Sequence, residues 1–220
     1  MEVLLSILIP SIPERLQLLT PLVTKLQQQI GDKPVELMVM MDNRKQPLGT
    51  KRNTMMATCL GKHLTHLDDD DDVADDYVDA ILGRLVEAPS VDVLSFNSQT
   101  DLGDGMPFVV KASLAYENQQ TNIEERDIEV EVPAVPEDAD GKGCDAYTKT
   151  EKQQYRPDIT RLPWHWCVWR SELARQGKFP VEFMGEDWVW IQQVVPLCKT
   201  ETRINRTLHR YFYNKNVSLS

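Results

Sequence analysis

The sequence predicts an α/β fold with a mostly parallel central sheet flanked by helices, and with a smaller antiparallel or mixed portion. Up to Asn97, short apolar runs alternate with amphipathic stretches of helical periodicity. That alternation is typical of right-handed crossovers between parallel strands. After Asn97 it stops, and turn-rich and period-two stretches replace it. The 220 residues are enough for one sizeable core with an elaborated edge, so we expect one domain.

Four short apolar runs of the first half are the predicted strands. They are continuous rather than alternating, as expected for strands covered on both faces, and they span residues 3–9, 35–41, 64–67 and 91–96. The stretches between them have apolar residues at helical spacing, which predicts helices over residues 11–30, 50–60 and 73–85.

The first of these helices has two notable positions. Ser11, followed three residues later by Glu14, has the pattern of a capping box at a helix start. Pro21 falls inside the periodic stretch, so it either kinks the helix or marks a restart with Thr20 as the cap. Gly31 ends the helix.

The second half gives weaker signals. We expect strands within residues 106–116, at 128–132, and near 202–204 and 208–213; helices over 171–176 and 187–195; and an acidic, mobile loop over 133–143. Residues 164–169 form another dense apolar segment. No linker separates the two halves, which supports one domain.

Composition excludes some classes of function. The formal net charge of −10 argues against a broad surface for nucleic acid, because such a surface needs clustered Lys and Arg. No apolar run approaches the roughly 20 residues that span a bilayer, and the first run lacks the basic start of a signal peptide. The cysteines have neither zinc-ligand spacing nor a dense disulfide pattern, so we expect a cytoplasmic protein: Cys59, Cys144, Cys167 and Cys198.

Polar side chains follow the first three predicted strands, at residues 10–15, 42–44 and 68–72. The carboxyl ends of parallel strands meet at one edge, where ligands bind. The five aspartates of 68–72 could simply be a solvated loop or a charged helix start. Their place directly after an apolar strand favours a Mg²⁺ or Mn²⁺ site that also holds a diphosphate, since these ions prefer carboxylate and phosphate oxygen.

Six motifs stand out: "LDDDD" after a strand, "GTKRN" at a helix start, "SILIPSIPERLQLL", "VMMDN", "FPVEFMGEDWVW" and "LHRYFYNKNVS". These motifs resemble those of the inverting, family-two glycosyltransferases of GT-A fold. Together they cover most of the chain, except residues 97–156. The stretch "RLPWHWCVWRSELARQGKFP" is similar to small members from bacteriophages and bacteria. The resemblance implies that residues 1–97 bind a nucleotide-sugar and 98–220 the acceptor.

The resemblance also implies roles for the acidic turn. Asp68 and Asp70 match the D-x-D pair, which contacts the ribose and coordinates the metal, and Asp71 matches a third acidic position often present. Asp69 lies between them; it is less constrained and is placed with the nucleotide-sugar contacts. One departure is at residues 75–76, where aspartates replace the prolines common in the family.

Other positions match the donor site of the family. Asp42 matches the acidic residue that reads the nucleoside, Arg15 and Arg52 match basic positions near the phosphates, and Pro10 shapes the first loop. Lys51 stands beside Arg52 in the first turn of a predicted helix. Cations are unfavourable there unless a phosphate faces them, although both could be ordinary helix residues.

The resemblance places the catalytic base at Asp187, with Glu186 beside it, and a late metal ligand or diphosphate contact at His209. Read from local pattern alone, Asp187 would be the cap of the helix that it begins. His209 is as compatible with a structural histidine as with a ligand. His165, between two tryptophans, is more typical of a packed core residue.

The expected function is metal-dependent, inverting transfer of a hexose from a nucleotide-diphospho-sugar to an acceptor hydroxyl, with Mn²⁺ or Mg²⁺ as cofactor. A UDP-sugar is the expected donor, since it is the commonest in the resembling group. The acceptor is left open among a glycan, a small hydroxylated molecule and a hydroxymethylated DNA base. Two alternatives are a nucleotidyltransferase, disfavoured by the lack of glycine in "PSIPER", and a non-catalytic cation- or carbohydrate-binding module.

Overall fold

A computed structural model describes residues 2–134, 145–181 and 185–213. Its strands are β1 (Leu5–Ser11), β2 (Val35–Met41), β3 (His63–His66), β4 (Asp72–Val73), β5 (Val93–Asp101), β6 (Phe108–Ala112), β7 (Glu124–Val132), β8 (Tyr147–Tyr155), β9 (Ile159–Arg161), β10 (Val168–Arg170) and β11 (Glu201–Phe212). Its helices are η1 (Pro13–Arg15), α1 (Leu16–Ile30), α2 (Leu48–Thr58), α3 (Tyr77–Glu87), α4 (Ser171–Ala174), α5 (Glu186–Val194) and η2 (Val195–Leu197).

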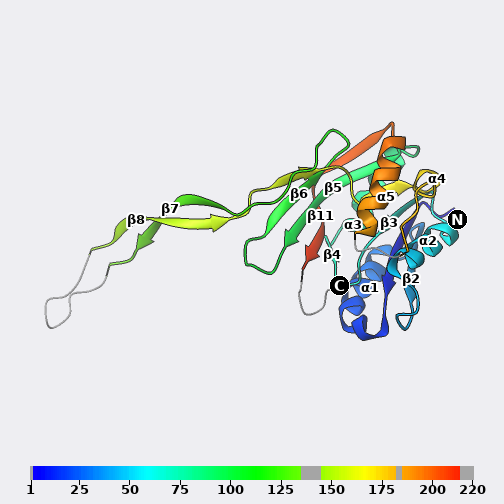
Figure 1. Ribbon diagram of the computed structural model, residues 1–220, viewed down its shortest axis with the longest axis horizontal. Helices are drawn as coiled ribbons and strands as arrows, with labels where there is room; N and C mark the ends of the chain where they lie inside the picture. Colours follow the sequence, from blue (N-terminus) through cyan, green and yellow to red (C-terminus); the bar gives the residue numbers. More distant parts are fainter. Residues whose placement is uncertain (1, 135–144, 182–184, 214–220) are drawn as a thin grey trace.

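The central sheet is curled and mostly parallel, as predicted (Figure 1). Its strand order is β2-β1-β3-β10-β5-β11-β4, and β6 and β9 extend it from β5. The strands β2, β1, β3, β5 and β11 run in one direction, and the short β10 and β4 run against them. The carboxyl ends of β1, β2 and β3 therefore lie at one edge, where Ser11 pairs with Met41.

Helices cover this sheet because each has one apolar stripe. The inner residues of α1 are Leu19, Leu22 and Leu26, and α1 packs beside α3. The chain moves from β1 outward to β2 and then back past β1 to β3, so right-handed crossovers place α1 and α2 on opposite faces. α2 approaches the loop after α4 so closely that a Cβ on Gly49 would lie 2.0 Å from the Pro180 carbonyl oxygen.

Two sequence expectations about the first helix are settled differently. Ser11 ends β1 instead of capping a helix, and its hydroxyl donates to Asp69. Of the two alternatives at Pro21, a restart with Thr20 as the cap is wrong, because α1 runs without interruption past Pro21. A proline removes only one backbone hydrogen bond, and the buried leucine stripe of α1 compensates for that loss.

The second half departs further from expectation. The two late strands are one strand, β11, with register shifts around Thr207. The strands β8, β9 and β10 were not predicted. β7 and β8 form a long two-stranded ribbon that projects from the body (Figure 1). The predicted loop at 133–143 lies outside the described residues from 135 onward.

Within the described ranges, no helix has both the length and the apolar character required to cross a membrane.

Candidate functional site

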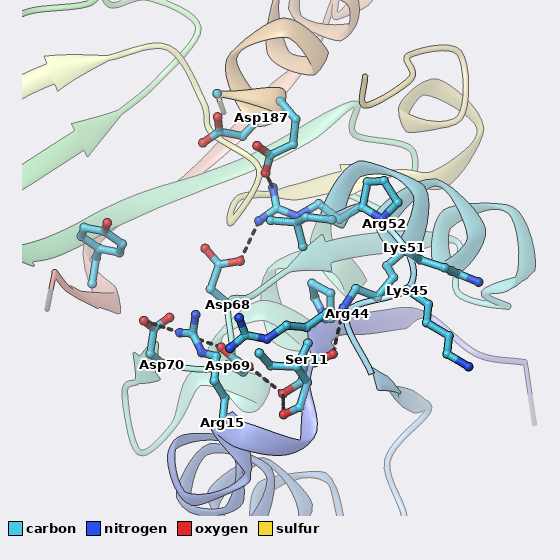
Figure 2. Close-up of a pocket in the computed structure, with 18 residues that line it drawn as sticks. Ser11, Arg15, Arg44, Lys45, Lys51, Arg52, Asp68, Asp69, Asp70 and Asp187 are labelled. Carbon is cyan, nitrogen blue, oxygen red and sulfur yellow. Dashed lines mark hydrogen bonds and ion pairs between the residues drawn. The ribbon is translucent and has the colours of Figure 1, made fainter. Parts of the chain in front are cut away.

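A cavity of about 660 Å³ opens at the shared edge of β1, β2 and β3 (Figure 2). The segments after the three strands line it, as the strand-end argument predicted, and so do Gly185 and Tyr211 from the second half. Five cations and five carboxylates face this cavity, which we call the first cavity: Arg15, Arg44, Lys45, Lys51, Arg52, Asp68, Asp69, Asp70, Glu186 and Asp187. Their formal charges cancel.

The acidic turn after β3 is held by Arg15 (Figure 2). The Arg15 guanidinium lies 2.8 Å from Asp69 and 2.5 Å from Asp70, and the Ser11 hydroxyl donates to Asp69 at 2.6 Å. Burial, together with the charge of Asp68, raises the pKa of Asp70 to about 6 despite the nearby Arg15. One arginine therefore does not balance this cluster, and Asp70 would bind added positive charge favourably.

Arg52 joins the acidic turn to the start of α5. Its side chain is buried, with one nitrogen 2.6 Å from Asp68 and another 3.3 Å from Glu186. Burial alone would lower the pKa of Arg52, but the charges of Asp68, Glu186 and Asp187 raise it overall. Arg52 therefore stays protonated and fixes two segments that are far apart in sequence.

Asp42 shapes the loop after β2. One of its oxygens accepts the backbone N–H groups of Lys45 and Gln46, both at 2.7 Å, and the other lies 2.7 Å from Lys51. Lys51 also donates to the Ser11 carbonyl at 2.9 Å. Asp42 does not line the first cavity. Its predicted contact with the nucleoside remains a prediction, and its visible role is to hold the loop and Lys51.

A second cavity of about 600 Å³ lies on the other side of Asp68. Its wall includes Trp164, Trp166 and Phe108. Asp68, Asp187 and Tyr211 line both cavities, so they form the boundary between them.

Asp187 lies at this boundary, near the start of α5. The indole N–H of Trp164 donates to Asp187 Oδ2 at 2.8 Å, and His165 Nδ1 lies 3.5 Å from the same oxygen. Gly185, not Asp187, occupies the cap position of α5. Burial alone would raise the pKa of Asp187, but His165 and Arg52 lower it well below its usual range. The carboxylate is therefore ionised at neutral pH.

Asp71 and His209 lie in the second cavity, apart from Asp70. His209 Nε2 is 2.9 Å from Asp71, its Nδ1 is 2.8 Å from the Ser98 hydroxyl, and its ring stacks on Trp166. The proposed metal set is thus divided between the two cavities. In the parts of the chain that the structure describes, no three His, Cys, Asp or Glu side chains form a preformed metal site.

Of the predicted residues, the first cavity gathers Pro10, Arg15, Lys51, Arg52, Asp68, Asp69, Asp70, Glu186 and Asp187. The sequence did not reveal Trp164, Arg161 or Tyr211 as cavity residues. His165 is buried, as predicted, and also faces Asp187. The dense aromatic stretch was the local signal for Trp164 and His165. Residues 182–184 of "FPVEFMGEDWVW" and 214–218 of "LHRYFYNKNVS" lie outside the described residues.

No family model matches the chain, and no curated protein matches it. Solved structures do match its fold. Staphylococcus aureus TarS 1–349 in complex with UDP-GlcNAc superposes with a TM-score of 0.61 at 13% identity, over 99% of this chain and 62% of that one. The same fragment in complex with UDP gives 0.59 at 14%, over 96% and 60%.

A longer TarS structure gives a TM-score of 0.58 at 14% identity, and this chain covers 37% of it. This chain thus spans less than two thirds of the length of each of these structures. The likeness establishes the fold: a GT-A-like glycosyltransferase fold, with a curled, mostly parallel sheet flanked by helices and a small second sheet.

Proposed function

We propose that this protein is a glycosyltransferase that moves a sugar from a UDP-sugar to an acceptor hydroxyl, with inversion at the anomeric carbon. The observation that carries the proposal is the position of Asp187, an ionised and largely enclosed carboxylate on the boundary between two cavities. Such a boundary allows donor and acceptor to meet at one carboxylate. The GT-A-like fold supports a nucleotide-sugar as donor.

The first cavity is the proposed donor site. It lies outside the carboxyl ends of parallel strands, where nucleotides bind in open α/β sheets. Arg15, Lys51 and Arg52 line it and can face the phosphates. The two TarS complexes contain UDP-GlcNAc and UDP, which supports uridine as the base.

A divalent cation, Mn²⁺ or Mg²⁺, is part of the proposal. Asp68 and Asp70 offer the carboxylate oxygens that these ions prefer, and Asp71 Oδ1 is buried with no hydrogen-bond partner among the described residues. Mg²⁺ is usually held by one or two carboxylates plus substrate phosphates, so the carboxylates of this turn could hold it without a third protein ligand.

Charge balance supports the same assignment. The cations and carboxylates of the first cavity cancel, so a bound diphosphate would leave excess negative charge. Burial and the charge of Asp68 together raise the pKa of Asp70 despite Arg15, so a bound cation would favour the ionised form of Asp70. When bound, the ion would stabilise charge on the departing diphosphate.

Asp187 is the proposed general base. In a single displacement, the acceptor oxygen forms a bond to the anomeric carbon as the bond from that carbon to the diphosphate oxygen breaks. The acceptor hydroxyl proton goes to Asp187, and the diphosphate leaves with the electron pair. Trp164 and His165 orient the carboxylate from the side of the second cavity, which is the proposed acceptor site. Glu186 supports the site through Arg52.

Thermal unfolding with nucleotides tests the donor assignment. UDP at 100 times its dissociation constant should stabilise the protein by about 2.7 kcal/mol, or roughly 5–10 °C for a domain of this size. Mn²⁺ should increase the shift given by UDP, and Asp70→Asn should remove that increase. The matched control is Asp75→Asn, in the same acidic segment but with a side chain that is 94% exposed. An equal shift with and without Mn²⁺ would reject the metal, and no shift with UDP would reject the donor.

A further inference from the structure

Arg161 lies in the wall of the second cavity and has no ion-pair partner among the described residues. It ends β9, and its guanidinium carbon lies 4.4 Å from the centroid of the Trp164 ring. The side chain makes no ion pair with any of the described residues, and its Nε is buried without a hydrogen-bond partner there. Arg161 is partly buried, and the buried part of a cation loses hydration that a partner normally replaces.

The other arginines near the two cavities all have partners. Arg15 pairs with two aspartates, Arg52 pairs with Asp68 and Glu186, and Arg203 donates to Tyr116 and Asn97. For Arg161, burial lowers the pKa, and the charge of Asp187 only partly opposes that effect. The Nε atoms of Arg15, Arg52 and Arg203 also have no hydrogen-bond partner among the described residues, but the other nitrogens of those side chains contact a carboxylate or a polar group. Arg161 makes no such contact within the described residues, so we expect it to bind an anion.

The carboxylates of the second cavity do not form an ion pair with Arg161, and each already has another partner. Asp68 pairs with Arg52, Asp71 lies 2.9 Å from His209, and Asp187 accepts the indole N–H of Trp164. The stacking on Trp164 holds the guanidinium plane in place. Its N–H groups are then pre-oriented for a carboxylate or phosphate, which they can bind through two parallel hydrogen bonds.

We propose that the acceptor carries a carboxylate or phosphate group that Arg161 binds, and that this contact places a neighbouring hydroxyl at Asp187. The proposal rests on the proposed function, because it treats the second cavity as the acceptor site. Trp164 links the two roles, since its ring faces Arg161 and its N–H bonds Asp187. An aromatic wall beside a guanidinium fits a sugar ring with one anionic substituent.

A polyanion fits less well. The chain has a formal net charge of −10, and the β7–β8 ribbon places four acidic residues on one of its faces. These are Glu125, Asp127, Glu129 and Glu131. Lys152 lies on the same face and offsets part of this charge. A DNA acceptor would meet the remaining negative charge, whereas a small anionic group could be bound by Arg161.

Paired probes test the proposal on the wild-type protein. The first pair is methyl β-D-glucuronide and methyl β-D-glucoside, and the second is glycerol 3-phosphate and glycerol. Binding is measured by tryptophan fluorescence, with and without saturating UDP and Mn²⁺. The anionic member of at least one pair should bind about 10-fold more tightly or better, as expected for a charge-assisted hydrogen bond. The pair that responds distinguishes carboxylate from phosphate. Equal affinities in both pairs, or no binding of either anion, would overturn the proposal.

Variants then assign the preference to Arg161. Arg161→Gln should abolish the preference for the anion, and Arg161→Lys should keep part of it, which serves as the test if the glutamine variant does not fold. Arg126→Gln is the matched control, because Arg126 also stacks on an aromatic ring, Tyr155, but in the exposed ribbon. An unchanged preference in both Arg161 variants would overturn the assignment.

UDP binding, measured separately, distinguishes this proposal from the donor assignment. Loss of the anion preference in Arg161→Gln with normal UDP binding supports both. Anion binding that depends on Arg161 in a protein that does not bind UDP would leave the anion site standing and reject the transferase. A duplex containing hydroxymethylcytosine is a further probe, and tight binding that Arg161→Gln does not weaken would overturn a small anionic acceptor in favour of DNA.

Discussion

The two cavities on either side of Asp187 differ in how their charges are satisfied. In the first, cations and carboxylates are equal in number and many are joined in ion pairs, such as Arg15 with Asp70. In the second, Arg161 faces the space without a partner among the described residues, beside an aromatic wall. A ligand of the first cavity must replace ion pairs that the protein already makes. A ligand of the second cavity can bind Arg161 without breaking an ion pair among the described residues.

This difference fits two kinds of ligand. A diphosphate with its counter-ion can replace the contacts within the acidic turn, because it supplies both negative and positive charge. An acceptor with one anionic group needs only one matching cation. Asp187 belongs to both cavities, so substitutions there and at its supports separate the two roles.

The largest expected effect is on the rate of sugar transfer, when Asp187 at the boundary of the two cavities is changed. Asp187→Asn should lower the rate of sugar transfer about 100- to 10,000-fold, the range typical of losing a general base. Binding of UDP should change little, because Asp187 lies at the edge of the first cavity. Steady-state transfer assays and UDP titrations check this. Full transfer activity in the variant would reject Asp187 as the base.

The next largest effect is on the free energy of unfolding, when Arg52, which joins the acidic turn to α5, is changed. Arg52→Gln leaves Asp68 and Glu186 without their buried partner, so it should lower the free energy of unfolding by about 3–5 kcal/mol. Arg206→Gln breaks an exposed pair with Asp76 and should cost about 1 kcal/mol or less. Urea denaturation measures both. Equal losses in the two variants would show that Arg52 does not connect the cavities energetically.

A smaller effect is expected on the pH dependence of stability, through Asp70 in the acidic turn. The pKa of Asp70 is about 6 in the folded protein, above its usual value of 3.8, so its contribution to stability is full below about pH 4 and lost as pH rises through 6. Asp70→Asn does not titrate. Without added metal, the stability of this variant relative to wild type should therefore rise by about 1–2 kcal/mol between pH 4.5 and 7.5. A difference that stays constant with pH would contradict a deficit of positive charge in the turn.

The first cavity could be predicted from sequence because its residues adjoin apolar strands. The strand β2 has the predicted bounds, and the aspartates directly after β3 lie where the parallel-strand rule puts them. Local signals sufficed there. The same rule does not reveal that Asp71 turns toward the second cavity, since adjacent side chains in a turn can point in different directions.

The second cavity could not be predicted in this way. Its contacts join segments that are far apart, such as Asp187 with Trp164, and β9 with β6. Strand pairing of this kind depends on tertiary packing that local periodicity does not record. The strand β8, "YTKTEKQQY", has no apolar alternation because both faces of the ribbon are largely exposed. The aromatic stretch at 164–169 signalled burial but not which side chain would face Asp187.

The central claim is that a UDP-sugar occupies the first cavity with its anomeric carbon directed at Asp187. A crystal structure of the protein with UDP-GlcNAc and Mn²⁺ tests it most directly. The account predicts the diphosphate between the acidic turn and Arg52, with the sugar at the boundary of the two cavities. An empty first cavity, or a donor bound with its sugar facing away from Asp187, would contradict it.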